Sequence, residues 1–415
     1  MDDPMKSQEV CAIIGASHAG VNCAFALRKE GWKGKIIMYD GDPELPYHRP
    51  PLSKAYLSAG DIMGLTPLKS EAAYLKEDIV LRLGTRINAI HPKRKEIILE
   101  NGDSQAYHKL VIATGARPII PRIPGIETAT HLYPLRTAAH VNCIQEAIKS
   151  GAGKEVVIIG GGYIGLETAA SLKKLGANVK VLEREERILA RVTAPVMSDF
   201  FHQLHTENDV EVLTGKNVVS IESNGNQNTV TCEDGSHYIA DLIIVGVGIK
   251  VNVEMAEKAG IKIKNGILVD NSARTNDKDI YAIGDCTYHF NTYYDRFVRL
   301  ESVQNAVDQA KIAAAAICGK EAGYNAIPWF WSDQFDVKLQ MVGLSEGYDE
   351  VIIRKENTDN CFSLWYFIGD DLLSVDAVNN AKAYVWGTKF LKSRVPIDKE
   401  KLKDSTVDLK AIPKV

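Results

Sequence analysis

Apolar and polar positions repeat one pattern at two places in the chain: a short apolar run, a glycine-containing turn and an amphipathic segment. At the second place, Val156–Glu183, the run Val156–Ile159 is continuously apolar and β-prone, which predicts a strand buried in a parallel sheet. The next residues have the apolar spacing of a helix, and Asn178–Leu182 predicts a further strand. Val10–Asp40 repeats this order, so we expect two strand–turn–helix–strand units.

The turn of the second unit reads Gly160-x-Gly162-x-x-Gly165. Between a strand and a helix, these glycines make a tight turn, let backbone amides approach a pyrophosphate, and let the helix pack closely on the strand. The helix N-terminus adds free N–H groups and a partial positive charge for the phosphates. This arrangement predicts a dinucleotide site.

An acidic residue at the end of the next strand, Glu183, indicates which dinucleotide. Its carboxylate can accept hydrogen bonds from a ribose, and it would repel the additional phosphate of NADP. We therefore expect NADH, although Arg184 and Arg187 follow closely and leave NADPH open.

The first unit carries a related turn, Gly15-x-Ser17-x-x-Gly20, in which a small serine replaces the middle glycine. Two such units in one chain imply two dinucleotides, one FAD and one NAD. The later segment Thr275–Cys286 contains Gly284-Asp285 after a short apolar strand, and a carboxylate there suits the ribityl chain of a flavin. We therefore assign FAD to the first unit and NAD to the second.

Prolines and glycine-rich strand ends indicate where the chain passes between these domains. Residues 113–115 (Ala113, Thr114 and Gly115) end a strand, and Pro118, Pro121 and Pro124 then predict a stiff crossover. The strand Leu242–Gly248 predicts the return. We expect an FAD-binding domain at 1–117 and 249–327, an NAD-binding domain at 118–248, and a C-terminal α+β domain at 328–415.

Three further segments have recognisable local patterns. In Leu45–Leu57 two prolines precede Ser53, which we expect to cap a helix that starts at Lys54. Glu301–Lys320 predicts a helix with Ser302 as its cap, whose N-terminus could face the flavin. Short β-prone runs follow Pro328, then a helix near Tyr384–Ser393, and we expect the last residues, 401–415, to be a solvated extension.

Composition excludes several classes of protein. The 415 residues are 45% hydrophobic and 25% charged, which is typical of a globular protein, and the net charge of −4 gives no indication of nucleic-acid binding. No apolar run approaches the length of a membrane span, and the N-terminus is acidic and polar, so we expect a cytoplasmic protein that does not associate with membranes. The seven cysteines include no C-x-x-C pair, which argues against a disulfide framework, a metal site and an active-site dithiol.

Taken together, these motifs resemble those of the FAD-dependent, NADH-oxidising ferredoxin reductases of bacterial oxygenase systems. The most specific segments are Pro50–Leu57, Val156–Glu167, Val192–Phe201, Gly284–Cys286, Glu301–Ala306 and Pro328–Gln334. The resemblance implies two Rossmann-type domains of the glutathione-reductase kind with a C-terminal α+β domain. It covers nearly the whole chain.

The resemblance also implies site residues. The FAD contacts, with those of the first turn, fall on Gly15, Ser17, Ala19, Gly20, Asp40, Asp42, Arg49, Lys54, Ile87, Ala113, Thr114, Gly115, Arg136, Asp285, Val303 and Trp331. The NAD contacts fall on Gly160, Gly162, Tyr163, Ile164, Gly165, Glu167, Glu183 and Gly248. Two departures from the family pattern leave questions open. Asp40-Gly41-Asp42 does not show which aspartate holds the FAD ribose, and Lys250-Val251-Asn252 lacks the usual proline.

By this resemblance, a hydride passes from NADH to FAD, and single electrons then pass to a [2Fe-2S] ferredoxin that serves a terminal oxygenase. Lys54 and Glu167 would form the catalytic pair beside the flavin, with the lysine supplying positive charge and the glutamate orienting the nicotinamide carboxamide. Trp331 would pack where electrons leave, and Lys69 and Lys311 would help to dock an acidic ferredoxin. The alternatives are an NADH oxidase or rubredoxin reductase of the same fold, or a flavoprotein whose binding to partners is controlled by NADH.

Overall fold

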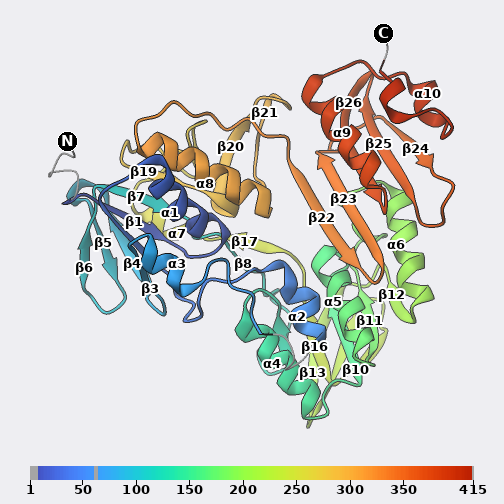
Figure 1. The fold of residues 1–415 in the computed structure, drawn as a ribbon. Coiled ribbons are helices and arrows are strands. Elements are labelled where there is room, and N and C mark those ends of the chain that lie inside the picture. Colours follow the sequence, from blue (N-terminus) through green and yellow to red (C-terminus); the bar gives the residue numbers. More distant parts are fainter. Residues whose placement is uncertain (1–7, 60–63, 414–415) are drawn as a thin grey trace. The chain divides into compact units, whose positions relative to one another are not determined.

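The computed structural model describes residues 8–59 and 64–413 (Figure 1). The polar N-terminal residues 1–7 of the sequence analysis and the last two residues of the expected extension lie outside this range. The chain divides into two compact units. The first contains the residues up to His48, Leu65–Arg117 and Lys250–Pro328, and the second contains Arg49–Gly64, Pro118–Ile249 and the residues from Trp329 onward. Thus the described residues 49–59 and 64, which the sequence analysis places in the FAD-binding domain, cluster with the second unit.

The first unit is built on a parallel sheet in the order β19-β7-β1-β2-β3. Its strands are β1 (Val10–Ile14), β2 (Lys35–Tyr39), β3 (Ile79–Arg82), β7 (Lys109–Ile112) and β19 (Ile280–Ala282). Helices α1 (His18–Glu30) and α8 (Val303–Ile317) lie side by side (Figure 1). Their buried alanines and Leu27 of α1 share one core with Ile13 of β1. Ser302 caps α8 by accepting a hydrogen bond from the Asn305 amide, which confirms the predicted cap.

Smaller elements complete this unit. The other face of the sheet shares a core with β4 (Ile87–His91), β5 (Glu96–Leu99) and helix α7 (Glu254–Lys258). The remaining elements are α3 (Glu71–Lys76), η4 (Pro92–Arg94), β6 (Ser104–Ala106), β18 (Ile267–Val269), η5 (Gly284–Cys286), β20 (Thr287–Asn291) and β21 (Arg296–Val298). Strands β8 (Ala116–Pro118) and β17 (Ile249–Val251) lie where the chain leaves and re-enters the unit.

The second unit repeats the parallel arrangement, in the order β12-β11-β10-β16-β9. Its strands are β9 (Leu132–Pro134), β10 (Glu155–Ile159), β11 (Asn178–Leu182), β12 (Val210–Leu213) and β16 (Leu242–Val245). Helices α4 (Ala138–Lys149), α5 (Tyr163–Lys174) and α6 (Pro195–Glu207) accompany them, with an antiparallel sheet of β13 (Val218–Asn224), β14 (Gln227–Cys232) and β15 (His237–Ala240). The two parallel sheets confirm the predicted fold class.

The same unit contains an antiparallel sheet in the order β22-β23-β26-β25-β24, with α9 (Ala381–Ser393) along one face (Figure 1). Its strands are β22 (Trp329–Gln334), β23 (Val337–Gly343), β24 (Glu350–Lys355), β25 (Phe362–Ile368) and β26 (Asp371–Val378). Side chains on successive residues of β22 alternate between faces. Phe330, Ser332 and Gln334 therefore share one face, and Trp329 and Trp331 share the other.

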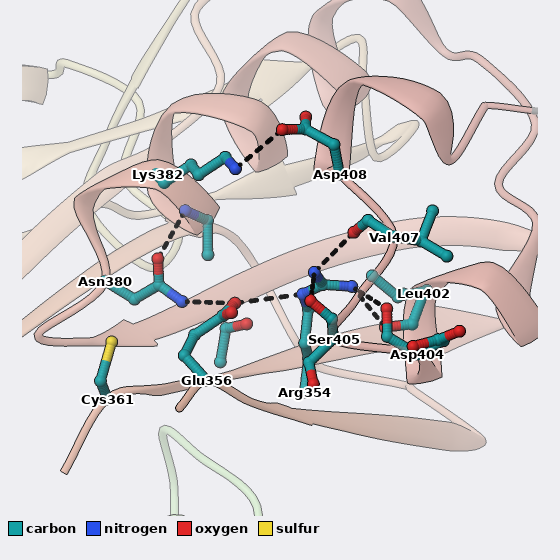
Figure 2. Close-up of polar contacts among 12 residues, drawn as sticks. Arg354, Glu356, Cys361, Asn380, Lys382, Leu402, Asp404, Ser405, Val407 and Asp408 are labelled. Carbon is teal, nitrogen blue, oxygen red and sulfur yellow. Dashed lines mark hydrogen bonds and ion pairs between the residues drawn. The ribbon is translucent and has the colours of Figure 1, made fainter. Parts of the chain in front are cut away.

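The expectation that the chain ends in a solvated extension is wrong for residues 401–413. Helices α10 (Lys399–Lys403) and η6 (Leu409–Ala411) lie there, and Leu402, Leu409 and Ile412 are buried. Figure 2 shows how Arg354 of β24, 2% exposed, holds this segment. Its guanidinium donates to Glu356 and to the carbonyl oxygens of Leu402, Asp404, Ser405 and Val407.

A buried carboxylate joins the C-terminal sheet to the loop before α6. Asp376 of β26 accepts hydrogen bonds from the Tyr366 hydroxyl at 2.6 Å and from the Thr193 hydroxyl at 2.8 Å. Burial raises the pKa of Asp376 to about 6 from an ordinary value of 3.8, although the two hydroxyls favour the charged form.

This carboxylate predicts an unusual dependence of stability on pH. Because its pKa is raised in the folded state, the unfolded chain ionises first, and stability falls as the pH rises from about 4 to about 6. The side chain of Asp376→Asn cannot ionise. The free energy of unfolding of this variant, relative to that of the native protein, should therefore rise by up to about 3 kcal/mol across this pH range. Chemical denaturation of the FAD-loaded protein at pH 4.5 and 7.5 measures the difference. Parallel pH curves for the two proteins would contradict the assignment.

Candidate functional site

The two glycine turns have the same backbone geometry, one in each unit. Gly15 and Gly160 have φ of 105° and 114°, a left-handed conformation that favours glycine. A Cβ atom on Gly20 would lie 1.9 Å from the carbonyl oxygen of Gly15, and one on Gly165 would lie 2.1 Å from that of Gly160. The last glycine of each motif is therefore required for the helix to pack against its own turn.

The middle position of each turn is not constrained by packing as the last glycine is. A Cβ atom on Gly162 would meet no protein atom within 4 Å, so the packing of the protein does not require glycine there. Gly162 and Ser17 both have extended backbone, with φ of −81° and −95°, and each precedes the first residue of its helix. Open space at a helix N-terminus, bounded by amides, fits a pyrophosphate.

Each unit also has an acid that braces its turn. Oδ2 of Asp40, after β2, accepts the amide N–H of Ala16 at 2.5 Å, and Oε2 of Glu183, after β11, accepts that of Gly161 at 2.6 Å. The second oxygen of each carboxylate accepts the amide two residues further on, from Asp42 and Glu185 respectively. Asp40 and Glu183 are therefore structural equivalents.

Asp42 has a different environment from Asp40. Its carboxylate accepts the Tyr47 hydroxyl at 2.8 Å and the Glu44 amide at 3.2 Å, both within its own loop.

Neighbouring strand ends complete the first unit's site. The Thr114 hydroxyl donates to the carbonyl oxygen of Asn252 at 2.7 Å, and the Asn252 side-chain amide donates to that of Thr114 at 2.8 Å. The Asn252 backbone amide also donates to Gly115, so this asparagine closes the turn although the usual proline is absent.

Gln309 of α8 was not identified from the sequence. Its buried Oε1 accepts the amide of Gly284 at 2.8 Å and the Thr287 hydroxyl at 3.0 Å, and thereby holds the turn that carries Asp285. The sequence contains no indication of this role, because a glutamine is common within a predicted helix such as Glu301–Lys320.

The second unit buries an ion pair at the residues expected to be catalytic. Glu167 on α5 is 2% exposed, and its Oε2 accepts from Lys54 Nζ at 2.6 Å. Ser53 also donates to Oε2, at 2.5 Å, and Ser332 of β22 donates to Oε1 at 2.7 Å. A buried carboxylate needs such donors to remain charged.

The expected helix cap at Ser53 is wrong. Pro50–Ser53 form a short 3₁₀ helix (η2), and the helix α2 (Ala55–Ser58) has no side-chain cap. The Ser53 hydroxyl binds the charged Glu167 instead, and a hydrogen bond to a charged group is stronger than one to a backbone amide.

The other expected NAD contacts lie near the start of α5. The Tyr163 hydroxyl donates to Met341 Sδ at 2.9 Å and its ring lies 5.2 Å from Phe330, while burial raises its pKa well above the ordinary value. Ile164 beside it is 44% exposed. The hydroxyl of Tyr163 is therefore directed into the protein, toward the C-terminal sheet.

The arginines that follow Glu183 differ in availability. Arg187 donates to the carbonyl oxygens of Thr193 and Ala190 and to the Ser198 hydroxyl, at 2.7 to 2.9 Å. Arg184 is 71% exposed and pairs with Glu185. The Arg187 guanidinium is therefore held by hydrogen bonds within the protein and is not free to bind a 2′-phosphate, which favours NADH over NADPH.

The predicted residues fall on both units. The first unit holds the FAD set Gly15, Ser17, Ala19, Gly20, Asp40, Asp42, Ile87, Ala113, Thr114, Gly115, Asp285 and Val303, with Lys69 and Lys311. The second holds Arg49, Lys54, Arg136, Trp331 and the whole NAD set. Within it, Arg49 donates to the carbonyl oxygen of Arg136 at 2.6 Å, and Trp331 lies 5.5 Å from Trp329.

Comparisons with known proteins agree with this geometry. Residues 10–310 match the pyridine nucleotide-disulphide oxidoreductase family, and residues 329–413 match the reductase C-terminal family. The chain is 41% identical to putidaredoxin reductase of Pseudomonas putida, over 98% of this chain and 97% of that protein. It is 38% identical to a ferredoxin–NAD(P)⁺ reductase of Sphingomonas sp., over 93% of each.

Among solved structures, the chain is similar to the reductase in the covalent putidaredoxin reductase–putidaredoxin complex. The TM-score is 0.93 at 40% identity, over 97% of this chain and 98% of that one. Among the described residues, none of the helices is long and apolar enough to cross a membrane.

Proposed function

We propose that this chain, which belongs to the pyridine nucleotide-disulphide oxidoreductase family and is an FAD- and NADH-dependent reductase, passes electrons to a [2Fe-2S] ferredoxin that serves an oxygenase. The observation that carries the proposal is the pair of equivalent nucleotide turns, one in each unit, in a sequence that has no C-x-x-C pair. All seven cysteines are described, and each is a free thiol. Electrons would then leave directly from the flavin. We place the protein in the cytoplasm.

Bound FAD would supply the chemistry, because a flavin accepts two electrons as hydride and releases them singly. Residues of the first turn, with Asp285 and the N-terminus of α8, would hold it. In the second unit, Glu183 would hold the ribose of NADH, and Glu167 would orient its nicotinamide carboxamide. Lys54 would supply positive charge where negative charge develops.

Asp40, rather than Asp42, is our candidate for the FAD ribose, because it corresponds to Glu183 in the other turn. Asp40→Ala should weaken FAD binding by about ten- to a hundredfold, since it removes charge-assisted hydrogen bonds. Asp42→Ala is the matched control and should retain FAD. The ratio of flavin to protein absorbance after gel filtration measures both. Loss of FAD from the Asp42 variant alone would reverse the assignment.

Basic side chains would steer an acidic ferredoxin toward the reductase. Lys69 is exposed and lies 5.2 Å above the Phe25 ring, and Lys311 is 63% exposed and lies 3.3 Å from Asp308. We infer that both take part in docking. Ferredoxin reduction should then slow with added salt, while flavin reduction by NADH should not.

Stopped-flow absorbance under anaerobic conditions tests the function. NADH should bleach the flavin, and an oxidised [2Fe-2S] ferredoxin added afterwards should be reduced. Bleaching without electron transfer to ferredoxin or rubredoxin, followed by rapid reoxidation in air, would indicate an NADH oxidase. Slow bleaching with a persistent charge-transfer band would indicate a flavoprotein that uses NADH to control binding.

A further inference from the structure

We propose that Ser332 and Gln334 of β22, with His205 of α6, are positioning residues that fix Glu167 for its contact with the nicotinamide carboxamide. The proposal deepens the proposed function and rests on it. It gives the C-terminal sheet a part in hydride transfer that is separate from docking. It also gives a role to Ser332 and Gln334. From the sequence, Trp331 was the only residue of the segment Pro328–Gln334 with an expected role.

A continuous chain of hydrogen bonds joins these side chains. The Ser332 hydroxyl lies 2.7 Å from Glu167 Oε1, and Gln334 Nε2 lies 3.2 Å from the same hydroxyl. Gln334 Oε1 lies 2.9 Å from His205 Nε2. Ser332, Gln334 and His205 are all 0% exposed, so water does not compete for these contacts.

The direction of every hydrogen bond follows from the carboxylate. An ionised glutamate only accepts, so the Ser332 hydroxyl donates to it and must accept from the Gln334 amide. That leaves Gln334 Oε1 toward the histidine, so His205 carries its proton on Nε2. Each group in this series of hydrogen bonds then points a donor toward Glu167, which holds its Oε1 in one orientation.

The environment of His205 keeps these hydrogen bonds in this direction, because it keeps the imidazole ring neutral. Burial lowers its pKa to about 4, so the ring is neutral at physiological pH. The groups that face it are Gln334, His202 on its own helix, and the Phe335 ring at 5.1 Å. Its Nδ1 is buried and has no hydrogen-bond partner among the described residues, so Nε2 is the only polar contact of the ring.

Packing alone does not explain these hydrogen-bonded side chains. Ser332 and Gln334 occupy positions on a buried strand face where apolar residues would cost nothing to desolvate. Lys54 and Ser53 already satisfy Oε2 of Glu167, and Ser332 is the partner of the other oxygen. Without it, the carboxylate could rotate about its last bond.

Calorimetric binding of NAD⁺ and of ADP-ribose to the FAD-loaded protein tests the proposal, because ADP-ribose lacks the nicotinamide. Ser332→Ala should weaken NAD⁺ binding about three- to tenfold and leave ADP-ribose unchanged. Ser332→Thr keeps the hydroxyl and should restore NAD⁺ binding. Ser374→Ala is the matched control, since Ser374 is a buried serine of the same sheet whose hydroxyl has no partner among the described residues.

The limiting rate of flavin reduction by NADH supplies a second measurement. Ser332→Ala and Gln334→Leu should each slow it, and the double variant should be no slower than Ser332→Ala, because the two residues act in series. Equal weakening of NAD⁺ and ADP-ribose, additive rates, or the same losses in Ser374→Ala would overturn the proposal. If NADH does not reduce the flavin of the native protein, the proposed function itself fails, and the two failures are thereby distinguished.

Discussion

Replacing Lys54 with methionine is expected to slow the reduction of bound FAD by NADH about a hundredfold, while FAD stays bound. Lys54 Nζ lies 2.6 Å from Glu167, and the lysine side chain is only 20% exposed, so its charge is poorly screened. A preorganised charge of this kind typically contributes two to three orders of magnitude in rate. Methionine is unbranched like lysine and fills most of its volume, but it removes the charge and the hydrogen bonds that Nζ donates to Glu167 and to the carbonyl oxygen of Pro50. Anaerobic stopped-flow absorbance gives the rate, and the ratio of flavin to protein absorbance gives the FAD content.

The variant also leaves Glu167 without a cation. Breaking a buried ion pair by removing one partner costs about 3–5 kcal/mol, because the remaining charge is uncompensated. A slow rate could therefore reflect a displaced Glu167 instead of a missing positive charge. The double variant Lys54→Met/Glu167→Gln separates the two effects, since its glutamine is neutral.

We expect the double variant to recover stability and to remain slow in flavin reduction. A double variant as fast as Glu167→Gln alone would assign the loss to the stranded carboxylate. Unchanged reduction in Lys54→Met would remove the catalytic role of the lysine altogether.

Features set by local spacing could be predicted from the sequence. The strand and helix of Val156–Glu183 follow from consecutive residues, and the observed α5 and β11 fall within this stretch, while β10 begins one residue before it, at Glu155. Ser302 likewise caps its helix through an amide three residues away. In such cases the chain segment contains all the atoms on which its conformation depends.

Features that depend on distant partners could not be predicted. Ser53 has the sequence of a helix cap, yet its hydroxyl binds a carboxylate 114 residues further on. The last residues are polar enough to suggest a solvated extension, yet Arg354 holds four of their carbonyl oxygens from 48 to 53 residues away. Alternation along β22 could have placed Ser332 and Gln334 on one face, but it could not have identified Glu167 and His205 as their partners.

The choice between Asp40 and Asp42 shows where sequence spacing stops being informative. Both aspartates follow the same strand, and either carboxylate could reach a ribose. They are separated by their contacts: Asp40 accepts the Ala16 amide, as Glu183 accepts that of Gly161, whereas Asp42 accepts from Tyr47 and Glu44 of its own loop. The second nucleotide turn of the same chain therefore provides the comparison that distinguishes Asp40 from Asp42.

Replacing Glu183 with alanine is expected to lower kcat/KM for NADH by about ten- to a hundredfold and to raise the relative use of NADPH. The carboxylate would hold the ribose hydroxyls through charge-assisted hydrogen bonds worth about 1.5–3 kcal/mol each, and it would repel a 2′-phosphate. Its removal also leaves the amides of Gly161 and Glu185 without their acceptor. Part of the loss for NADH would therefore come from a loosened turn.

Glu183→Gln separates the two contributions. A glutamine can still accept the Gly161 amide, but it carries no charge to repel a phosphate. We expect it to lose less activity with NADH than alanine does, and still to shift the ratio of kcat/KM for NADH and NADPH toward NADPH. The shift should stay modest, because Arg187 is held by Thr193, Ala190 and Ser198, and the exposed Arg184 is paired with Glu185. An unaltered ratio in both variants, measured at one ionic strength, would mean that Glu183 braces the turn without selecting the coenzyme.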